Sequence, residues 1–288
     1  MKYCGAFEIQ VLTKNSDFYR GEKSMQTIDL DEVNKYVEDN IGTFHEARIE
    51  GLKKLKLKTI LSRKNPYLYK AKNLLTAQDI VKALLDAHLS SSEEAVFGTF
   101  LEGLAKFICS KVYNGTKSSA EGIDLEFENE NIKYLLSVKS GPNWGNSQQI
   151  ERMKNNFTKA IKILNTNSSP RQVICVNGCC YGKVHSDTGL YLKLCGQEFW
   201  TLISGDETVY TKIIEPVGYK AKEKNEEFYN KYSQVLNKFT LEFMQDFCTP
   251  DGEIIWEEIV KLTSEKKEAK TPKTSGSKRK PSTQKNLR

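Results

Sequence analysis

Two carboxylates and two other polar side chains alternate with apolar residues in the stretch GIDLEFENENIKYLLSVKSG. Asp124 and Glu126 come first, and Ser137 and Lys139 follow after a short polar segment. Carboxylates are natural ligands of Mg²⁺, and a nearby ammonium can hold a nucleophilic water or offset charge on a phosphoryl group. These residue types therefore suit the hydrolysis of a phosphodiester. An ordinary amphipathic hairpin with solvated charges is the alternative, because the pattern alone is weak.

Two extended segments must position these side chains. Apolar and polar residues alternate over residues 123–127 and again over 132–139, which predicts two half-buried strands joined by the turn-forming run ENEN. If Glu128 lies opposite Lys133 as a cross-strand ion pair, Asn129 to Ile132 form a four-residue loop. The segment is therefore predicted to be a β-hairpin.

In that register Asp124 falls opposite Ser137, and Lys139 and Glu126 lie on the same face of the hairpin. The other face is continuously apolar and can pack on a core. One face would then carry two carboxylates and an ammonium at the strand ends, where a divalent cation and a phosphate could bind.

The order of elements around this hairpin resembles that of the PD-(D/E)xK nuclease superfamily. A helix with an acid, VFGTFLEGLAKFI, precedes a strand with GID, a strand that ends in SVK, and a further helix. More narrowly, the chain resembles type II restriction endonucleases. The similarity to PmeII-type enzymes lies in NPYLYKAKNLLTAQDIVKALLDAHLSSSEEAVFGTFLEGLA, SVKSGPNWGNSQQI, GQEFWTLISGD and DGEIIW, between Asn65 and Trp256. The resemblance implies an α/β (α+β) fold with a restriction-endonuclease-like mixed central sheet flanked by helices.

The resemblance also implies roles for individual residues. The metal-binding aspartate of the superfamily matches Asp124, and its lysine matches Lys139. Where the superfamily has a second acid this chain has Ser137, whose hydroxyl is a poor ligand for Mg²⁺. The second carboxylate must then come from elsewhere.

Three glutamates are candidates for that second carboxylate. Glu102 is favoured, because its helix stripe also contains the small residues Gly98, Ala105 and Cys109, although a solvated helix glutamate is the alternative. Glu151 follows, since some restriction enzymes with SVK recruit a glutamate from the next helix, and Glu126 is third. The expected catalytic residues are Asp124, Lys139, Glu102 and Glu151, and the expected metal ligands are Asp124, Glu102 and Glu126.

Two segments are candidates for DNA contact. Asn and Gln can bond adenine edges, which favours the loop and helix start after Lys139, where a plain turn with a helix cap at Asn146 or Ser147 is the alternative. The acid-free basic segment from Lys53 to Lys72 could contact phosphates or be a solvated helix face. The candidates are Asn143, Trp144, Asn146, Gln148 and Gln149 in the loop and helix start, and Lys53, Lys54, Lys56, Lys58, Arg63 and Lys64 in the basic segment.

Composition narrows the class of protein. The 288 residues carry a net charge of +6, but residues 266–288 alone carry +8, so the rest of the chain has a net charge of −2. With three histidines and no GxxxxGK[ST] loop, His-metal nucleases, Ser-His-Asp hydrolases and nucleotide-driven enzymes are disfavoured.

The seven cysteines lack disulfide spacing, which favours reduced thiols. The alternative for part of this set is a zinc site formed by Cys175, Cys179, Cys180, Cys195 and His185. Without a signal-peptide core or membrane span, a cytoplasmic, prokaryotic location is expected.

The expected organisation is an N-terminal helical, partly basic region over 1–64, a nuclease domain over 65–264 and a disordered basic tail over 265–288. The remaining patterns predict further elements. Helices are expected over 31–40, 43–58, from Thr76, from a capping box at Ser91 to about Val112, and over 148–164, 221–247 and 256–262, and strands over 173–176, 191–194 and 199–203.

The predicted function is Mg²⁺-dependent cleavage of both strands of a specific double-stranded DNA site, leaving 5′-phosphates. A homodimer is expected, because two-fold sites mirror two-fold proteins. The departure at Ser137 keeps a second hypothesis open, a catalytically inactive DNA-binding protein with a nuclease fold. A third is a repair or structure-specific nuclease without a fixed sequence.

Overall fold

The computed structural model describes residues 28–167 and 172–266. Within these ranges five strands form one mixed sheet in the order β1-β2-β3-β5-β4. β2, β3 and β5 run parallel, and β1 and β4 pair antiparallel at the two edges. The predicted mixed sheet flanked by helices is therefore confirmed. The strands are β1 (Leu125–Asn129), β2 (Ile132–Lys139), β3 (Gln172–Cys179), β4 (Ser186–Asp187) and β5 (Leu192–Cys195).

The hairpin β1–β2 has the predicted register, with Glu128 opposite Lys133. The predicted four-residue loop is wrong, because Asn129 and Ile132 form the last pair of the ladder. Glu130 and Asn131 make the turn, with φ angles of 49° and 64°. Two consecutive left-handed residues are typical of a type I′ turn, whose twist lets the strands pair to their ends.

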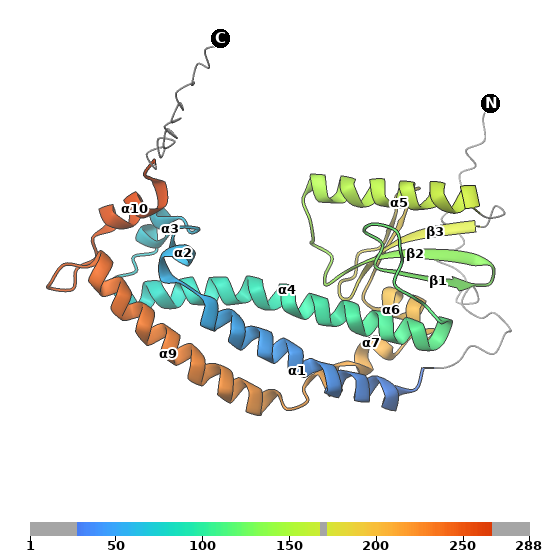
Figure 1. Cartoon of the computed structure of the whole chain (residues 1–288), viewed down its shortest axis with the longest axis horizontal. Coiled ribbons are helices and arrows are strands. Elements are labelled where there is room, and N and C mark those ends of the chain that lie inside the picture. Colours follow the sequence, from blue (N-terminus) through green and yellow to red (C-terminus); the bar gives the residue numbers. More distant parts are fainter. Residues whose placement is uncertain (1–27, 168–171, 267–288) are drawn as a thin grey trace, which may run out of the picture.

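Helices cover both faces of the sheet (Figure 1). α5 (Ser147–Asn167) packs Met153 and Phe157 with Leu135 of β2 on one face. The other face packs on α4 (Ala77–Tyr113) and α6 (Gln197–Ser204). The sheet is therefore buried on both sides, as parallel strands require.

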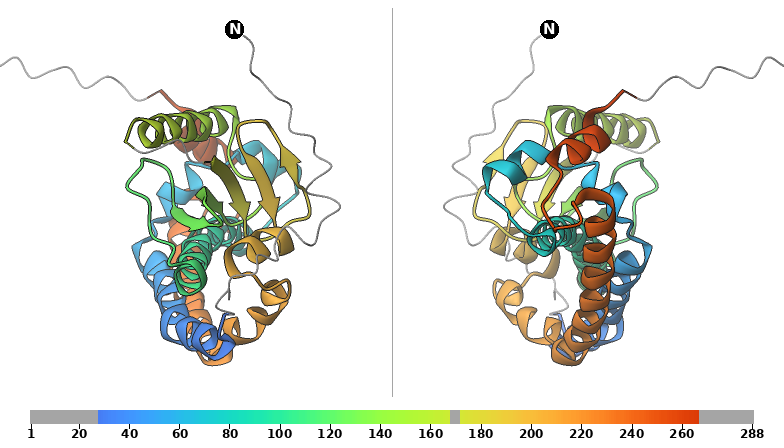
Figure 2. Two further views of the ribbon diagram at one scale, coloured as in Figure 1. Left: turned by 90° about the vertical axis from the view of Figure 1, so that its right-hand side faces the viewer. Right: turned by 90° about the vertical axis from the view of Figure 1, so that its left-hand side faces the viewer.

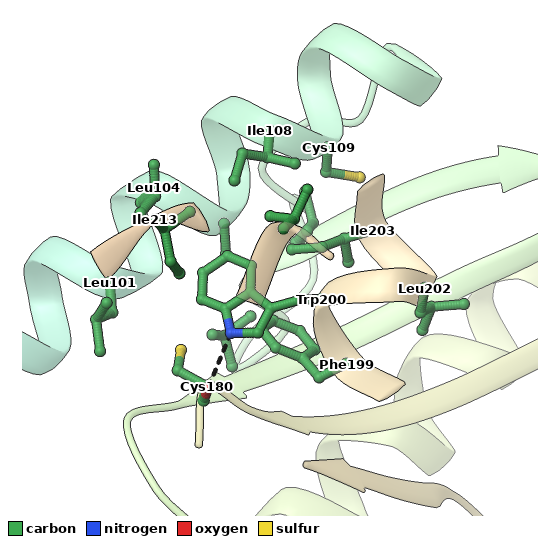
Figure 3. Packing of buried hydrophobic residues seen from close by; sticks show 14 of the residues in the cluster. Leu101, Leu104, Ile108, Cys109, Cys180, Phe199, Trp200, Leu202, Ile203 and Ile213 are labelled. Carbon is green, nitrogen blue, oxygen red and sulfur yellow. Dashed lines mark hydrogen bonds between the residues drawn. The ribbon is translucent and has the colours of Figure 1, made fainter. Parts of the chain in front are cut away.

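Trp200 of α6 lies at the centre of this second layer (Figure 3). Its indole N–H donates to the carbonyl oxygen of Cys180 at 2.8 Å, and its ring packs among apolar side chains of α4 such as Leu104. The predicted strand over 199–203 is wrong. Every residue from Phe199 to Ser204 is buried, so the segment has no exposed polar face. Without one, the spacing of apolar residues cannot distinguish a helix from a strand.

Away from the sheet the chain is helical. We call the sheet with α5 and α6 the sheet end, and α2, α3 and α10 with the adjoining parts of α1, α4 and α9 the helical end. The two ends lie at opposite ends of the long axis, and α1, α4 and α9 run between them (Figures 1 and 2). The bounds are α1 (Leu30–Lys54), α2 (Leu57–Leu61), α3 (Pro66–Ala71), α7 (Val209–Lys212), α8 (Ile214–Val217), α9 (Ala221–Phe247) and α10 (Trp256–Ser264).

Each end has its own core. At the helical end, Leu84 and Leu85 of α4 pack with Phe239 and Phe243 of α9. α1 contributes Val33, Val37 and Ile41 to the core at the sheet and Ile49 and Leu52 to the core at the helical end. The predicted domain boundary at residue 64 stays a prediction. Residues 267–288 of the predicted tail, like residues 1–27, lie outside the described residues.

Two predicted helix boundaries are wrong. α1 is one helix, not two, because buried residues recur every three to four positions from Val33 to Leu52. α4 runs unbroken through Ser91, whose hydroxyl donates to the carbonyl of Ala87 at 3.5 Å instead of capping a new helix. The predicted helices α5, α9 and α10 and strands β3 and β5 are confirmed, with small differences at their ends.

Candidate active site

The hairpin brings Asp124 and Lys139 together, as predicted. Lys139 Nζ lies 3.6 Å from Asp124 Oδ2. The same oxygen accepts the backbone N–H of Val138 at 2.8 Å and the hydroxyl of Ser137 at 3.4 Å. Oδ1 makes no hydrogen bond within the described part of the chain, so one carboxylate oxygen is fixed and the other is available to a ligand.

Lys139 is held at the end of β2 by three contacts. Besides Asp124, its ammonium donates to the carbonyl of Val138 at 3.0 Å and lies 5.1 Å from the centre of the Trp144 ring. The ring face attracts a cation. The charge is therefore directed toward the loop that follows β2.

A row of polar side chains crosses the sheet next to this pair. Ser137 on β2, Asn177 on β3 and Lys193 on β5 are register partners and share a face. Ser137 and Asn177 are buried. Asn177 and Lys193 are not predictable from the sequence, because each is isolated in its own segment and only the order of the parallel strands places them beside Ser137.

Lys193 brings a second ammonium to the site. It donates to the carbonyl of Pro142 at 2.9 Å and so fixes the loop after Lys139. Burial raises the pKa of the Cys179 thiol to about 12, and its hydrogen bond to Cys195 acts in the same direction. The ammonium groups of Lys193 and Lys139 oppose that increase, so both lie close to Cys179.

Glycines let the loop approach its neighbours. A Cβ on Gly141 would lie 2.3 Å from the ring of Tyr181. A Cβ on Gly98 would lie 3.2 Å from the Cβ atom of Ser140. α4 therefore passes close to the end of β2 at Gly98, the close approach that the small residues of its stripe predict.

Glu102 lies one turn further along α4. It pairs with Lys106 on its own helix and is about one third exposed. Burial raises the pKa of the Cys180 thiol, and the charge of Glu102 adds to that effect. Since the N–H of Cys180 donates to the carbonyl of Lys139 at 2.9 Å, Glu102 lies near the strand ends of the site.

The other two candidate acids have partners of their own. Glu126 accepts a hydrogen bond from Lys133 at 2.8 Å. Burial raises the pKa of Glu126, but hydrogen bonds from Lys133 and Ser118 outweigh it, so the pKa is lowered overall. The Glu151 side chain is 61% exposed and pairs with Lys154 at 3.7 Å. Among the described residues, no three His, Cys, Asp or Glu side chains are grouped as metal ligands.

The cysteine cluster consists of thiols inside the sheet. Cys175, Cys179, Cys180 and Cys195 are buried. Burial raises the pKa of Cys175 to about 12. His185 accepts the backbone N–H of Cys195 at 3.4 Å through Nδ1. These environments favour neutral thiols, whereas zinc binds the thiolate.

The DNA-contact candidates divide into two places. Asn146 and Gln149 cap α5 reciprocally, at 3.1 Å and 2.9 Å, which confirms the predicted helix cap. Asn143 and Gln148 are exposed, in the loop that follows Lys139 and in the first turn of α5. The basic candidates are mostly exposed at the end of α1, on α2 and in the turn after it, at the helical end and away from the sheet (Figure 1). Two of them pair with acids, Lys53 with Glu50 at 2.6 Å and Lys58 with Asp246 at 3.1 Å.

No helix among the described residues is both long enough and apolar enough to span a membrane. A family model described as type II restriction endonuclease EcoO109I matches residues 31–225. No curated protein matches the chain. The matched span is more than half of the chain and contains the whole sheet, α4, Asp124 and Lys139.

Proposed function

This chain belongs to the family of the type II restriction endonuclease EcoO109I, and from that premise we propose that it is an Mg²⁺-dependent endonuclease that hydrolyses both strands of a specific double-stranded DNA site. The observation that carries the proposal is the Asp124 carboxylate 3.6 Å from the Lys139 ammonium at the strand ends. This pair combines an oxygen ligand for a cation with a positive charge for a phosphate.

The oxygen donors of the site fit Mg²⁺. This ion is commonly held by one or two carboxylates and keeps several waters, so a complete cage of protein ligands is not required. Asp124 would hold it through Oδ1, and Glu102 would be the second acid, from α4. When bound, the ion supplies Lewis-acid polarisation of the phosphate and lowers the pKa of a water.

The chain's own groups supply orientation and charge. The N–H of Val138 and the hydroxyl of Ser137 fix Oδ2 of Asp124, so the carboxylate keeps one orientation. Lys139 would offset the negative charge that develops on the phosphoryl oxygens, and Lys193 would add to the positive field while fixing the Pro142 loop. Asn143, Trp144 and Gln148 would then contact the DNA beside the scissile bond.

Finer features of the proposal rest on the family resemblance. They are 5′-phosphate ends, a homodimer that matches a two-fold site, and the PmeII-type subtype. The basic segment Lys53–Lys64 would contact phosphates away from the cleavage site, because it lies at the helical end.

A second candidate function is a DNA-binding protein without catalysis. It is favoured by Ser137 at the position of an acid and by the lack of a group of three acidic, His or Cys ligands among the described residues. A repair or structure-specific nuclease is a further alternative, which would cut without a fixed sequence.

Digestion of phage DNA tests these alternatives. We expect discrete fragments with Mg²⁺, no cleavage with EDTA, and a loss of at least about 1000-fold in rate for Asp124→Ala, because the variant lacks the metal-binding carboxylate. Asp251→Ala, at an exposed turn of the helical end, is the matched control and should cut normally. Intact DNA with both Mg²⁺ and Mn²⁺ would favour the inactive binder, and a smear would favour the nuclease without a fixed site. Sequencing the fragment ends gives the recognition site and the 5′-phosphates.

A further inference from the structure

One buried polar atom near the site has no partner. Asn177 on β3 is 2% exposed, and its Oδ1 accepts no hydrogen bond in the described ranges. Among the described residues only His45, outside the site, has other buried side-chain atoms without a partner. Leaving a buried acceptor unpaired costs stability, so such a group in a native protein calls for an explanation.

The position of Asn177 indicates what its partner would be. It is the register partner of Ser137 on one side and of Lys193 on the other, on the face that carries Asp124 and Lys139. The nearby ammonium groups of Lys139 and Lys193 donate to the carbonyls of Val138 and Pro142, and no donor among the described residues bonds Asn177 Oδ1. Its position beside Asp124 points to a donor that a bound ligand brings to the site.

The spacing favours a hydrated cation. Asp124, Ser137 and Asn177 lie on successive chain segments of the sheet, so Asp124 and Asn177 are about 10 Å apart at the backbone. Side chains that stand roughly perpendicular to the sheet at that separation do not bring their oxygens within the roughly 4 Å that one directly bound Mg²⁺ requires. An ion that keeps its waters can bridge the longer distance, and Mg²⁺ gives up its waters reluctantly.

We propose that Asn177 is a positioning residue of the metal site, whose amide oxygen accepts a hydrogen bond from a water carried by the divalent cation that Asp124 holds. Together, Ser137 and Asn177 would replace the second acid of the superfamily motif. The Ser137 hydroxyl orients Asp124, and the Asn177 amide orients the hydrated ion. This inference rests on the proposed function, because it needs a cation at Asp124.

The test measures Mn²⁺ binding without DNA by calorimetry and thermal unfolding in EDTA. Asn177→Leu removes the oxygen and keeps much of the volume. We expect its Mn²⁺ affinity to fall about 10-fold or more, the usual effect of losing an outer-shell partner. Its melting temperature in EDTA should rise, because an unpaired buried acceptor is gone. A merely structural asparagine would instead lose stability on this change.

Asn177→Asp and a control complete the experiment. The aspartate should bind Mn²⁺ more tightly than the wild type and melt lower in EDTA, since an unpaired carboxylate would be buried. Thr201→Val, buried in α6 on the opposite side of the sheet, should keep the wild-type affinity. Asn177→Leu with wild-type affinity or a lower melting temperature in EDTA would overturn the inference. If Asn177→Leu does not fold, unchanged affinity of Asn177→Asp overturns it instead.

The outcomes also separate this inference from the proposed function. A wild-type protein that binds no Mn²⁺, or whose Mn²⁺ binding survives Asp124→Ala, overturns both. Mn²⁺ binding that depends on Asp124 but not on residue 177 leaves the proposed function in place and removes only the role of Asn177.

Discussion

The sheet end and the helical end each have a core of buried apolar residues but differ in the polar side chains that they bury. The sheet end buries polar side chains, including Ser137, Asn177, Thr201 and Ser204. In the described part of the helical end the buried side chains are apolar, with Phe239 and Phe243 among the largest. Polar burial costs free energy unless every group is paired. Among the described residues it is concentrated at the sheet end, with His45 on α1 as the exception, which indicates that chemistry is concentrated at the sheet and that the helical end supplies stability.

The largest test of this comparison is Phe243→Ala in the helical core. The ring is fully buried, so its removal should lower the free energy of unfolding by about 3–5 kcal/mol. Urea unfolding measures the change, and Leu241→Ala, 59% exposed on the same helix, should stay within about 0.5 kcal/mol of the wild type. Below its melting temperature Phe243→Ala should still cleave DNA. Loss of cleavage in the folded variant would contradict the division of roles.

The next test is Gly178→Ala on β3, between Asn177 and Cys179. A Cβ there would lie 2.3 Å from the ring of Phe199, which is fully buried. Overpacking of this kind should cost about 1–3 kcal/mol in thermal or urea unfolding. Gly51→Ala in α1 meets nothing within 4 Å and should stabilise by up to about 1 kcal/mol, since alanine favours helices. Equal effects at the two glycines would contradict the tight packing beneath the site.

The smallest expected effect is electrostatic. The pKa of Glu126 is lowered in the fold, so its contribution to stability is present above the ordinary carboxylate pKa and is lost as pH falls through the lowered value. Glu126→Gln should therefore be less stable than the wild type at pH 7, by about 1 kcal/mol, and should lose less stability on acidification to pH 3.

Urea unfolding at both pH values measures the difference. Glu253→Gln is the control at the helical end, because that exposed side chain makes no ion pair among the described residues. A Glu126→Gln profile parallel to that of the wild type would show that the Lys133 contact contributes nothing.

Much of the sheet end could be predicted where local pattern and tertiary contact agree. The alternation across the hairpin gave the pairing of Glu128 with Lys133 and the meeting of Asp124 with Lys139. The helical spacing of apolar residues correctly predicted the first and last residues of α9. These elements have one buried and one exposed face, so their sequences carry a visible period.

The failures have physical causes of their own. α6 is buried on all sides and shows no period, and the continuity of α4 past Ser91 depends on packing at both ends rather than on its capping signal. Asn177 was missed for a different reason. Its neighbours on β2 and β5 are distant in sequence, and the residue pattern of a single segment does not predict which parallel strands will lie beside it.

α4 links the two regions mechanically. It has 37 residues, about 55 Å of continuous helix, and contains no proline to kink it. Its first half packs into the helical core, while Gly98 and Glu102 in its second half adjoin the strand ends. Because one unbroken helix belongs to both cores, we expect the two ends to move as one rigid unit rather than as two hinged parts.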